Sequence, residues 1–275
     1  MANSLTAEQL RAFREDGVAH VPGAVDPEWI ERLLGVADQR LVDPGEWVND
    51  ANPGNERNRM FTERYMWQSN PVINDYVFHS GCAELAGQAM GSDAVRFYFD
   101  HLLIKEPATD AVTPWHQDIP YWPFMGKQVC SIWLALTDAT VEESAMEFVR
   151  GSHLSGNYYR PEVFNARSEH PNAWAEEAAG DPMPDIEADR GAFDIIGYDV
   201  AAGDAVIFSA WLLHGARGNN SAGKRRVALS TRWLGDDALW TPKAGSDPTV
   251  DPADVSVKPG EYPADDTLFP QVWPA

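Results

Sequence analysis

The sequence predicts a mainly β protein with a helical flank. Capping signals and helical periodicity occur in the first ninety residues, whereas segments rich in β-branched and aromatic residues follow from about residue 94. Turn signals separate these later segments, which favours an antiparallel sandwich or barrel. The chain has 275 residues, a size at which β folds are often single units. We expect one domain over 1–275, made of a helical flank (1–92), a β core (93–235) and a tail (236–275).

Helix signals recur along the flank. Thr6 and Gln9 have the spacing of a capping box, and Gly17 ends this first helix. Asp26 followed by Pro27 begins a second helix, whose apolar face consists of Trp29, Ile30, Leu33, Leu34 and Ala37. Residues 42–59, rich in Asn, Pro and Gly, are expected to form a loop. Asn70 before Pro71 begins another helix, and a further one is expected to end near Gly91.

Strand signals dominate the core. They cover residues 95–99, 102–104, 129–136, 146–149, 204–208 and 227–233. The polar segment 155–190 is expected to be a long loop, inserted as a lid or an extension. In the tail, eight acidic residues stand against two basic ones, and seven of the chain's 20 prolines occur there. This composition predicts an extended surface tail or partial disorder.

The charge of the chain excludes some partners. Lys and Arg number 21 against 42 Asp and Glu, a net charge of -21, which disfavours nucleic acid and anionic membranes. No apolar run is long enough for a membrane span, and the N-terminus lacks the pattern of a secretory signal. Two cysteines, Cys82 and Cys130, suit a reducing compartment. We therefore expect a cytoplasmic protein without nucleic-acid or membrane partners, and leave open whether it forms a homo-oligomer.

The triplet His116-Gln117-Asp118 indicates a metal site. Residues i and i+2 of a strand point to one side, so an imidazole and a carboxylate can meet at a divalent metal. Such a triplet alone also occurs as a solvated surface pair. Here Trp115 precedes it and the apolar residues 119–124 follow, and charged groups in apolar surroundings are usually paired or metal-bound.

A third ligand and a cation complete the predicted site. His214 lies between two predicted strands, and two histidines with one carboxylate form the facial triad of non-haem iron sites. Arg225 follows eleven residues later, and an arginine fork suits a carboxylate ligand. The alternative is a solvent-facing turn over 224–226, and the choice between Arg225 and Arg226 stays open. Residues 205–235 contain five basic and no acidic residues, which predicts a positively lined pocket within a negative shell.

These motifs together resemble the phytanoyl-CoA dioxygenase family. Those that carry the resemblance are His116-Gln117-Asp118, residues 134–138, Gly151-Ser152-His153, residues 203–208, and His214-Gly215 with Arg225. The family comprises non-haem iron, 2-oxoglutarate-dependent oxygenases, among them ectoine hydroxylase, and the resemblance spans about residues 10–235. It implies a double-stranded β-helix (jelly-roll, cupin-like) core.

The resemblance also implies roles for individual residues. His116, Asp118 and His214 would bind Fe(II), and Arg225 would bind the distal carboxylate of 2-oxoglutarate, with O2 as oxidant. Trp122 and Ser131 fall where ectoine hydroxylase-like members contact the co-substrate, and Lys105, which matches a lysine common in the family, is also expected to bind it. Two positions depart from the family pattern. Ala216 stands where a serine is frequent, and Arg150 stands where a proline is usual.

The expected activity is the oxidation of a small organic molecule. Hydroxylation of an unactivated C–H bond, with release of succinate and CO2, is the first choice. Asp118 occupies the position that related halogenases leave open for chloride, so halogenation is not expected. The substrate pocket is predicted from His101, Tyr121, Phe124, Trp133 and Trp211, although such aromatic residues can equally fill a core. The alternatives are a cupin-like metal enzyme that does not use 2-oxoglutarate and a non-catalytic binding protein on the same scaffold.

Overall fold

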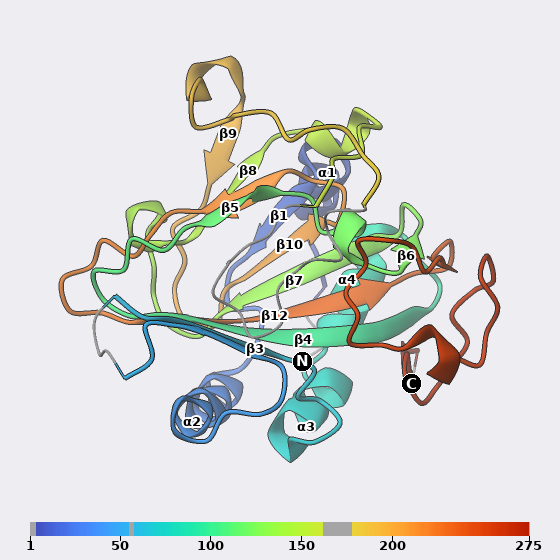
Figure 1. The fold of residues 1–275 in the computed structure, drawn as a ribbon, viewed down its shortest axis with the longest axis horizontal. Helices are drawn as coiled ribbons and strands as arrows, with labels where there is room; N and C mark the ends of the chain where they lie inside the picture. The colour runs from blue at the N-terminus through green and yellow to red at the C-terminus, as the bar shows by residue number, and fades with distance from the viewer. Residues whose placement is uncertain (1–3, 55–57, 162–177, 275) are drawn as a thin grey trace.

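Two facing β-sheets form the centre of the molecule (Figure 1). The computed structural model describes residues 4–54, 58–161 and 178–274. The larger sheet has the order β1 (Val18–Val21), β10 (Ala205–Ser209), β7 (Val129–Ala135), β12 (Arg226–Leu234), β4 (Val95–Lys105), β3 (Met60–Arg64), β2 (Val48–Ala51), and β14 (Gln271–Trp273) pairs with β4. The smaller sheet has the order β5 (Thr113–His116), β11 (His214–Ala216), β8 (Met146–Val149), β9 (Ile195–Gly197). A separate pair joins β13 (Leu239–Trp240) to β6 (Phe124–Met125). All these pairings are antiparallel, and the predicted jelly-roll core is confirmed.

Among the described residues, four α-helices lie outside the sheets: α1 (Ala7–Asp16), α2 (Pro27–Val42), α3 (Pro71–His79) and α4 (Cys82–Met90). Their ends follow the local signals. Thr6 and Gln9 form the predicted capping box, and Gly17 ends α1 with a φ of 86°, in the left-handed region that favours glycine. The Asn70 side chain accepts from the N–H groups of Val72 and Ile73 at the start of α3. The helices predicted in the flank are confirmed.

Strand β12 shows how the large sheet separates two environments. Val227, Leu229 and Trp233 pack into the core that α2 and α3 cover, which Figure 1 shows below the sheet. The alternate residues point to the space between the two sheets, because successive side chains of a strand face opposite sides. These are Arg226, Ala228, Ser230 and Arg232.

In the described part of the flank, three strands occur where no strand was predicted. β1, β2 and β3 all lie in the flank, and β2 falls inside the expected loop 42–59. Each is placed by a partner rather than by its own composition. β1 pairs with β10, which is distant in sequence, through Val18 opposite Phe208, and β3 pairs with β4. Pairing across such distances is invisible to local propensity.

The C-terminal segment is part of the packed structure. The expectation of an extended surface tail is wrong, because Trp240 and Phe269 are buried and β14 extends the large sheet. Its acidic residues accept backbone hydrogen bonds. Asp265, for example, accepts from the N–H groups of Ser256, Thr267 and Leu268. Carboxylates used in this way stabilise turns, so a high acid count does not require disorder.

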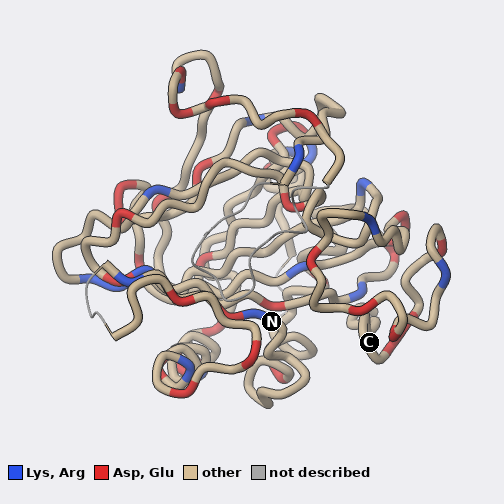
Figure 2. The backbone as a smooth tube through the Cα atoms, in the orientation of Figure 1, with Lys and Arg blue, Asp and Glu red and all other residues tan. Residues whose placement is uncertain are grey.

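Residues 162–177 of the expected loop 155–190 lie outside the described residues. In its described parts, Tyr159 forms a bridge with Asp181, and Ile186 is buried. Acidic residues are spread over the helices, the loops and the C-terminal segment (Figure 2). Among the described helices, none combines the length and the apolar character needed to cross a membrane.

Candidate metal centre

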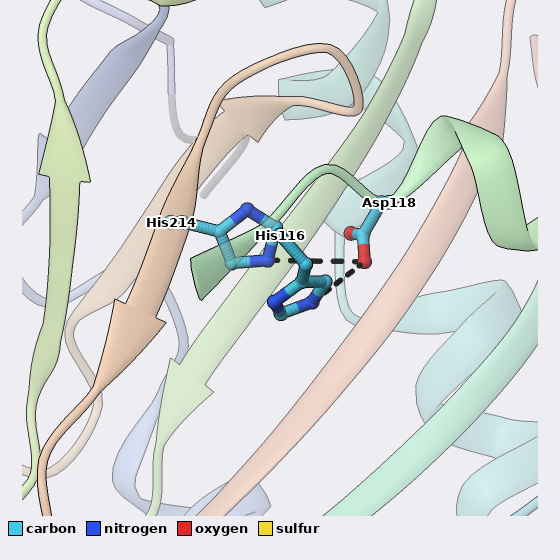
Figure 3. A group of neighbouring side chains, drawn as sticks. All are labelled: His116, Asp118 and His214. Carbon is cyan, nitrogen blue, oxygen red and sulfur yellow. Dashed lines mark ion pairs between the residues drawn. The ribbon is translucent and has the colours of Figure 1, made fainter. Parts of the chain in front are cut away.

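Two neighbouring strands of the small sheet bring His116 and His214 together. His116 ends β5 and His214 begins β11, and the register places them opposite each other. Their ring centroids are 4.1 Å apart. Asp118 Oδ1 lies 3.6 Å from His116 Nε2 and 3.8 Å from His214 Nε2 (Figure 3). All three side chains are buried, and their potential ligand atoms lie within 4.8 Å of one another.

Backbone carbonyls orient both imidazoles. The Nδ1–H of His116 donates to Pro114 O at 2.8 Å, and that of His214 donates to Leu212 O at 2.9 Å. A carbonyl only accepts, so each ring carries its proton on Nδ1 and turns the Nε2 lone pair toward Asp118. Fixing the second nitrogen in this way is typical of metal-binding histidines. Two neutral imidazoles and one carboxylate fit a divalent metal such as Fe(II).

The electrostatics hold the site in its metal-binding protonation state. Burial alone would raise the pKa of Asp118, but Arg232 and the two imidazoles outweigh burial and keep this pKa well below its ordinary value. Burial and the neighbouring His116 lower the pKa of His214 to about 3. At neutral pH the carboxylate is therefore charged and the His214 imidazole is neutral, as metal binding requires.

Asp118 reaches the site by a turn and not by strand alternation. β5 ends at His116, and Asp118 has helical dihedrals (φ -73°, ψ -39°) at the start of a 3-10 turn. The expectation that one strand aims both side chains is therefore wrong. Gln117, between them, stabilises this turn. Its amide donates to Asn157 O and Trp211 O and accepts from the N–H of Tyr159.

A cavity between the two sheets opens onto this centre. Of the five predicted pocket residues, His101, Tyr121 and Trp133 line it, and so does Trp122, which was predicted as a co-substrate contact. The other two predicted aromatics do not. Phe124 is fully buried against Trp240 and Phe269. Trp211 turns its Nε1–H to Gly126 O at 2.7 Å.

Ser131 and Lys105 support the site from outside the cavity wall. The Ser131 hydroxyl donates to Asp118 Oδ2 at 2.6 Å and thereby orients that carboxylate. Lys105 is fully buried, and its ammonium donates to the Arg217 carbonyl at 2.7 Å and to the Ala216 carbonyl at 3.5 Å. Lys105 therefore stabilises the segment that follows β11 and does not line the cavity.

The structure separates Arg225 from Arg226. Arg225 lies outside the cavity and pairs with Glu106 at 2.8 Å and with Asp38 of α2 at 3.0 Å. Arg226 is the first residue of β12 and lines the cavity, where it is 3 % exposed. The expectation that Arg225 reaches into the cavity does not hold, because Arg225 immediately precedes β12 and points to the side opposite to that of Arg226.

Three further charged residues line the cavity without having been predicted as site residues. Arg232 lies on the inner face of β12, and Arg64 pairs with Asp247 at 3.1 Å. Arg232 shares the parity of Arg226, six residues earlier, so strand alternation could have identified it. Arg64 and Asp247 carry no such signal, because the former lies in an unpredicted strand and the latter in the C-terminal segment.

A jelly roll in which two neighbouring strands and the turn after one of them bring together two imidazoles and a carboxylate defines a non-haem metal enzyme. The family model "Phytanoyl-CoA dioxygenase (PhyH)" matches residues 13–227. The chain belongs to the phytanoyl-CoA dioxygenase family, and it is an Fe(II)- and 2-oxoglutarate-dependent dioxygenase with O2 as oxidant. The family and the enzyme class predicted from the sequence are thus confirmed.

Individual relatives agree with this assignment. The multifunctional dioxygenase prhA of Penicillium brasilianum is 25% identical over 244 residues, which are 83% of this chain and 72% of prhA. The α-ketoglutarate-dependent carbocyclase SnoK from nogalamycin biosynthesis has a TM-score of 0.73 at 25% identity, covering 98% of both chains. EctD from S. alaskensis, solved with 2-oxoglutarate and 5-hydroxyectoine, shares the fold with a TM-score of 0.69 at 16% identity, covering 94% of this chain and 86% of EctD.

Proposed function

We propose that this dioxygenase oxidises an unactivated C–H bond of a small organic molecule, with hydroxylation as the principal reaction. One oxygen atom of O2 enters the product, the other enters succinate, and CO2 leaves the co-substrate. One observation carries the proposal: the triad, a buried arginine and several aromatic rings line a single cavity. A cytoplasmic location stays a prediction from the sequence, and the oligomeric state stays open.

Each polar residue has a role in this proposal. His116, Asp118 and His214 hold Fe(II), and Ser131 orients Asp118. Arg226 binds the distal carboxylate of 2-oxoglutarate. Its Nη1 donates to Leu103 O at 3.1 Å, its Nη2 to Ser144 Oγ at 3.3 Å, and its Nε has no hydrogen-bond partner among the described residues.

The charge and the fixed orientation of the Arg226 guanidinium suit it to bind a carboxylate. Burial lowers its pKa to about 10, so it stays cationic at neutral pH, and the hydrogen bonds from its two Nη atoms hold the fork in place. A buried cation of fixed orientation binds a carboxylate more strongly than a solvated one. When bound, iron and 2-oxoglutarate supply the oxidising equivalents, and the protein contributes ligands, an anchor and a dry cavity.

The remaining wall suits an apolar or ring-containing substrate. Phe99, Tyr121, Trp122 and Trp133 line the cavity and present large apolar surfaces near the triad. Such walls exclude water from the reacting centre. We therefore infer a small-molecule substrate whose oxidised carbon lies close to the metal.

Ring-forming oxidation is a second candidate. It is favoured by the likeness to SnoK, which is described as a carbocyclase. Asp118 occupies the third protein-ligand position, so no site is left there for a halide, and neither candidate reaction involves chlorination. Product mass separates the candidates, because hydroxylation adds one oxygen atom whereas ring closure removes two hydrogen atoms.

The decisive experiment is anaerobic titration of the purified protein with Fe(II) and 2-oxoglutarate. We expect a visible metal-to-ligand charge-transfer band in the wild type, no band in His116→Ala, and an unchanged band in Arg225→Gln. A substrate screen monitored by succinate release then follows. The proposal fails if the wild type forms no band, or if His116→Ala keeps it.

A further inference from the structure

The guanidinium of Arg232 is a second cation buried at the metal centre. It lies on the inner face of β12 with 8% of its side chain exposed, over the Phe99 ring at 5.0 Å and the Trp122 ring at 6.0 Å. Its Nε and Nη1 have no hydrogen-bond partner in the part of the chain that the structure describes. Burying a charged donor without partners is costly, so this group is suited to a ligand that supplies acceptors.

Asp118 does not supply the hydrogen-bond acceptors that Arg232 lacks. The distance from Arg232 Nε to Asp118 Oδ2 is 4.0 Å, which is too long for a hydrogen bond. Asp118 Oδ2 already accepts from Ser131 at 2.6 Å, and Asp118 Oδ1 faces the two imidazoles. Metal binding would occupy this carboxylate further. The donors of Arg232 therefore remain available to another acceptor.

His101 adds a second polar group on the neighbouring strand. It lines the same cavity, lies opposite Ser230 in the register of β4 and β12, and its Nε2 is buried with no hydrogen-bond partner among the described residues. Burial and the nearby Arg232 and Arg64 hold its pKa well below the ordinary value. His101 is therefore a neutral imidazole, which can offer one N–H to an acceptor.

The charge balance of the loaded cavity indicates the kind of acceptor. Arg64 and Asp247 neutralise each other, and Arg226 and Arg232 exceed Asp118 by one positive charge. Fe(II) adds two positive charges and 2-oxoglutarate adds two negative ones. The cavity thus retains one positive charge, which favours a singly charged anion as the remaining ligand.

We propose that Arg232 and His101 bind a carboxylate of the primary substrate, which is then a small carboxylic acid with an apolar body. This inference rests on the proposed function, since it assumes that the co-substrate occupies Arg226 and the metal. The same carboxylate chemistry could come from the metal-side carboxylate of 2-oxoglutarate, and the charge balance favours the substrate. Phe99 and Trp122, under the guanidinium, provide the apolar surface for a ring.

The test uses the Fe(II)- and 2-oxoglutarate-loaded protein without oxygen. Benzoate is the probe, benzamide is its uncharged match, and the shift of the charge-transfer band reports binding next to the metal. In the wild type, benzoate shifts the band and benzamide does not. Arg232→Gln weakens benzoate binding about 10- to 100-fold, as expected for a lost hydrogen bond to a charged group. Arg150→Gln, an exposed arginine outside the site, binds like the wild type.

Two further measurements keep the result interpretable. Arg232→Lys retains the charge and recovers part of the benzoate affinity, which a merely misfolded variant would not do. The affinity for 2-oxoglutarate stays within about threefold in Arg232→Gln, since Arg226 anchors the co-substrate.

Several outcomes would overturn the assignment. Equal benzoate affinity in the wild type and Arg232→Gln would do so, as would an equal response to benzamide or no response to benzoate. A loss of 2-oxoglutarate affinity of tenfold or more in Arg232→Gln would assign the subsite to the co-substrate instead. If the wild type forms no charge-transfer band, the proposed function itself is wrong. If the band forms but does not shift with benzoate, only this inference is wrong.

Discussion

The two faces of the large sheet are built from the same strands and have opposite characters. On the outer face, Val227, Leu229 and Trp233 of β12 pack with α2 and α3 in a buried apolar core. On the inner face, Arg226, Ser230 and Arg232 line a cavity, and both arginines have nitrogens without hydrogen-bond partners among the described residues. Packing on the outer face stabilises the fold. On the inner face, the unpaired donors lower the stability of the fold but are available to bind a ligand.

Arg225 and Arg226 illustrate the difference between the outer and the inner face of the large sheet. The two residues are adjacent, yet one pairs with Asp38 on the helix side and the other lines the cavity. Chemistry does not distinguish them, so strand parity alone decides which can meet a ligand.

Replacing each of these two arginines by glutamine, one at a time, should give the largest difference between the two faces. Arg226→Gln should weaken 2-oxoglutarate binding roughly 30-fold or more, because removing one partner of a buried charge pair costs about 2–5 kcal/mol. Arg225→Gln should leave the affinity within about twofold, since the Arg225 side chain pairs with Glu106 and Asp38 outside the cavity. Titration of the charge-transfer band measures both. Equal losses in the two variants would refute the division.

A core truncation tests the outer face. Leu229→Ala should lower the free energy of unfolding by about 2–5 kcal/mol, because Leu229 is 1% exposed in the helix-covered core. Its neighbour Ser230 lines the cavity, and Ser230→Ala should change stability by less than about 1 kcal/mol. Urea unfolding compares them. If Ser230→Ala were the more damaging change, the inner face would carry the stability instead.

A buried carboxyl on the outer side predicts a pH dependence. Asp100 accepts from the N–H groups of Met66 and Trp67, and burial raises its pKa to about 6. A raised folded-state pKa of an acid means that stability falls as pH rises from about 4 to about 6, by about 3 kcal/mol. Urea unfolding of the wild type and Asp100→Asn across this range measures the difference. Parallel pH curves for the two proteins would contradict the prediction.

The smallest expected effect concerns Ser131 on the inner face. Ser131→Ala removes the hydrogen bond to Asp118 Oδ2 and should lower Fe(II) affinity roughly 10- to 100-fold. Ser230→Ala is the matched control, because that serine lines the cavity. Competition with a chelator gives both affinities. An unchanged affinity in Ser131→Ala would show that the two imidazoles alone orient the carboxylate.

Much of the fold could be predicted from local sequence patterns. The capping box at Thr6 and the Asn70 cap mark helices that the structure contains, and β8 and β12 fall where β-rich segments were predicted. β1, β2 and β3 were missed. β1 and β3 pair with strands that are distant in sequence, and β2 then pairs with β3. Pairing of this kind depends on the whole chain, which no window of sequence contains.

The candidate site was predictable in composition and less so in geometry. The structure brings His116, Asp118 and His214 together, but by a turn after β5 rather than by alternation along it. Ser131 and Lys105 lie beside the site as supports, and Trp211 and Phe124 lie in packed regions. Residue type indicates what chemistry is available, whereas orientation depends on hydrogen bonds such as those of Gln117, which join distant segments.

The sequence by itself determined the enzyme family, the β class of the core, the three metal-binding residue types and the basic stretch over 205–235, because each is written in local composition and spacing. The tertiary structure alone decided that Arg226 faces the cavity in place of Arg225, and that the C-terminal segment contributes Asp247 to its wall. The reason is physical. A shift of one residue reverses the face of a strand, and only long-range pairing sets that register.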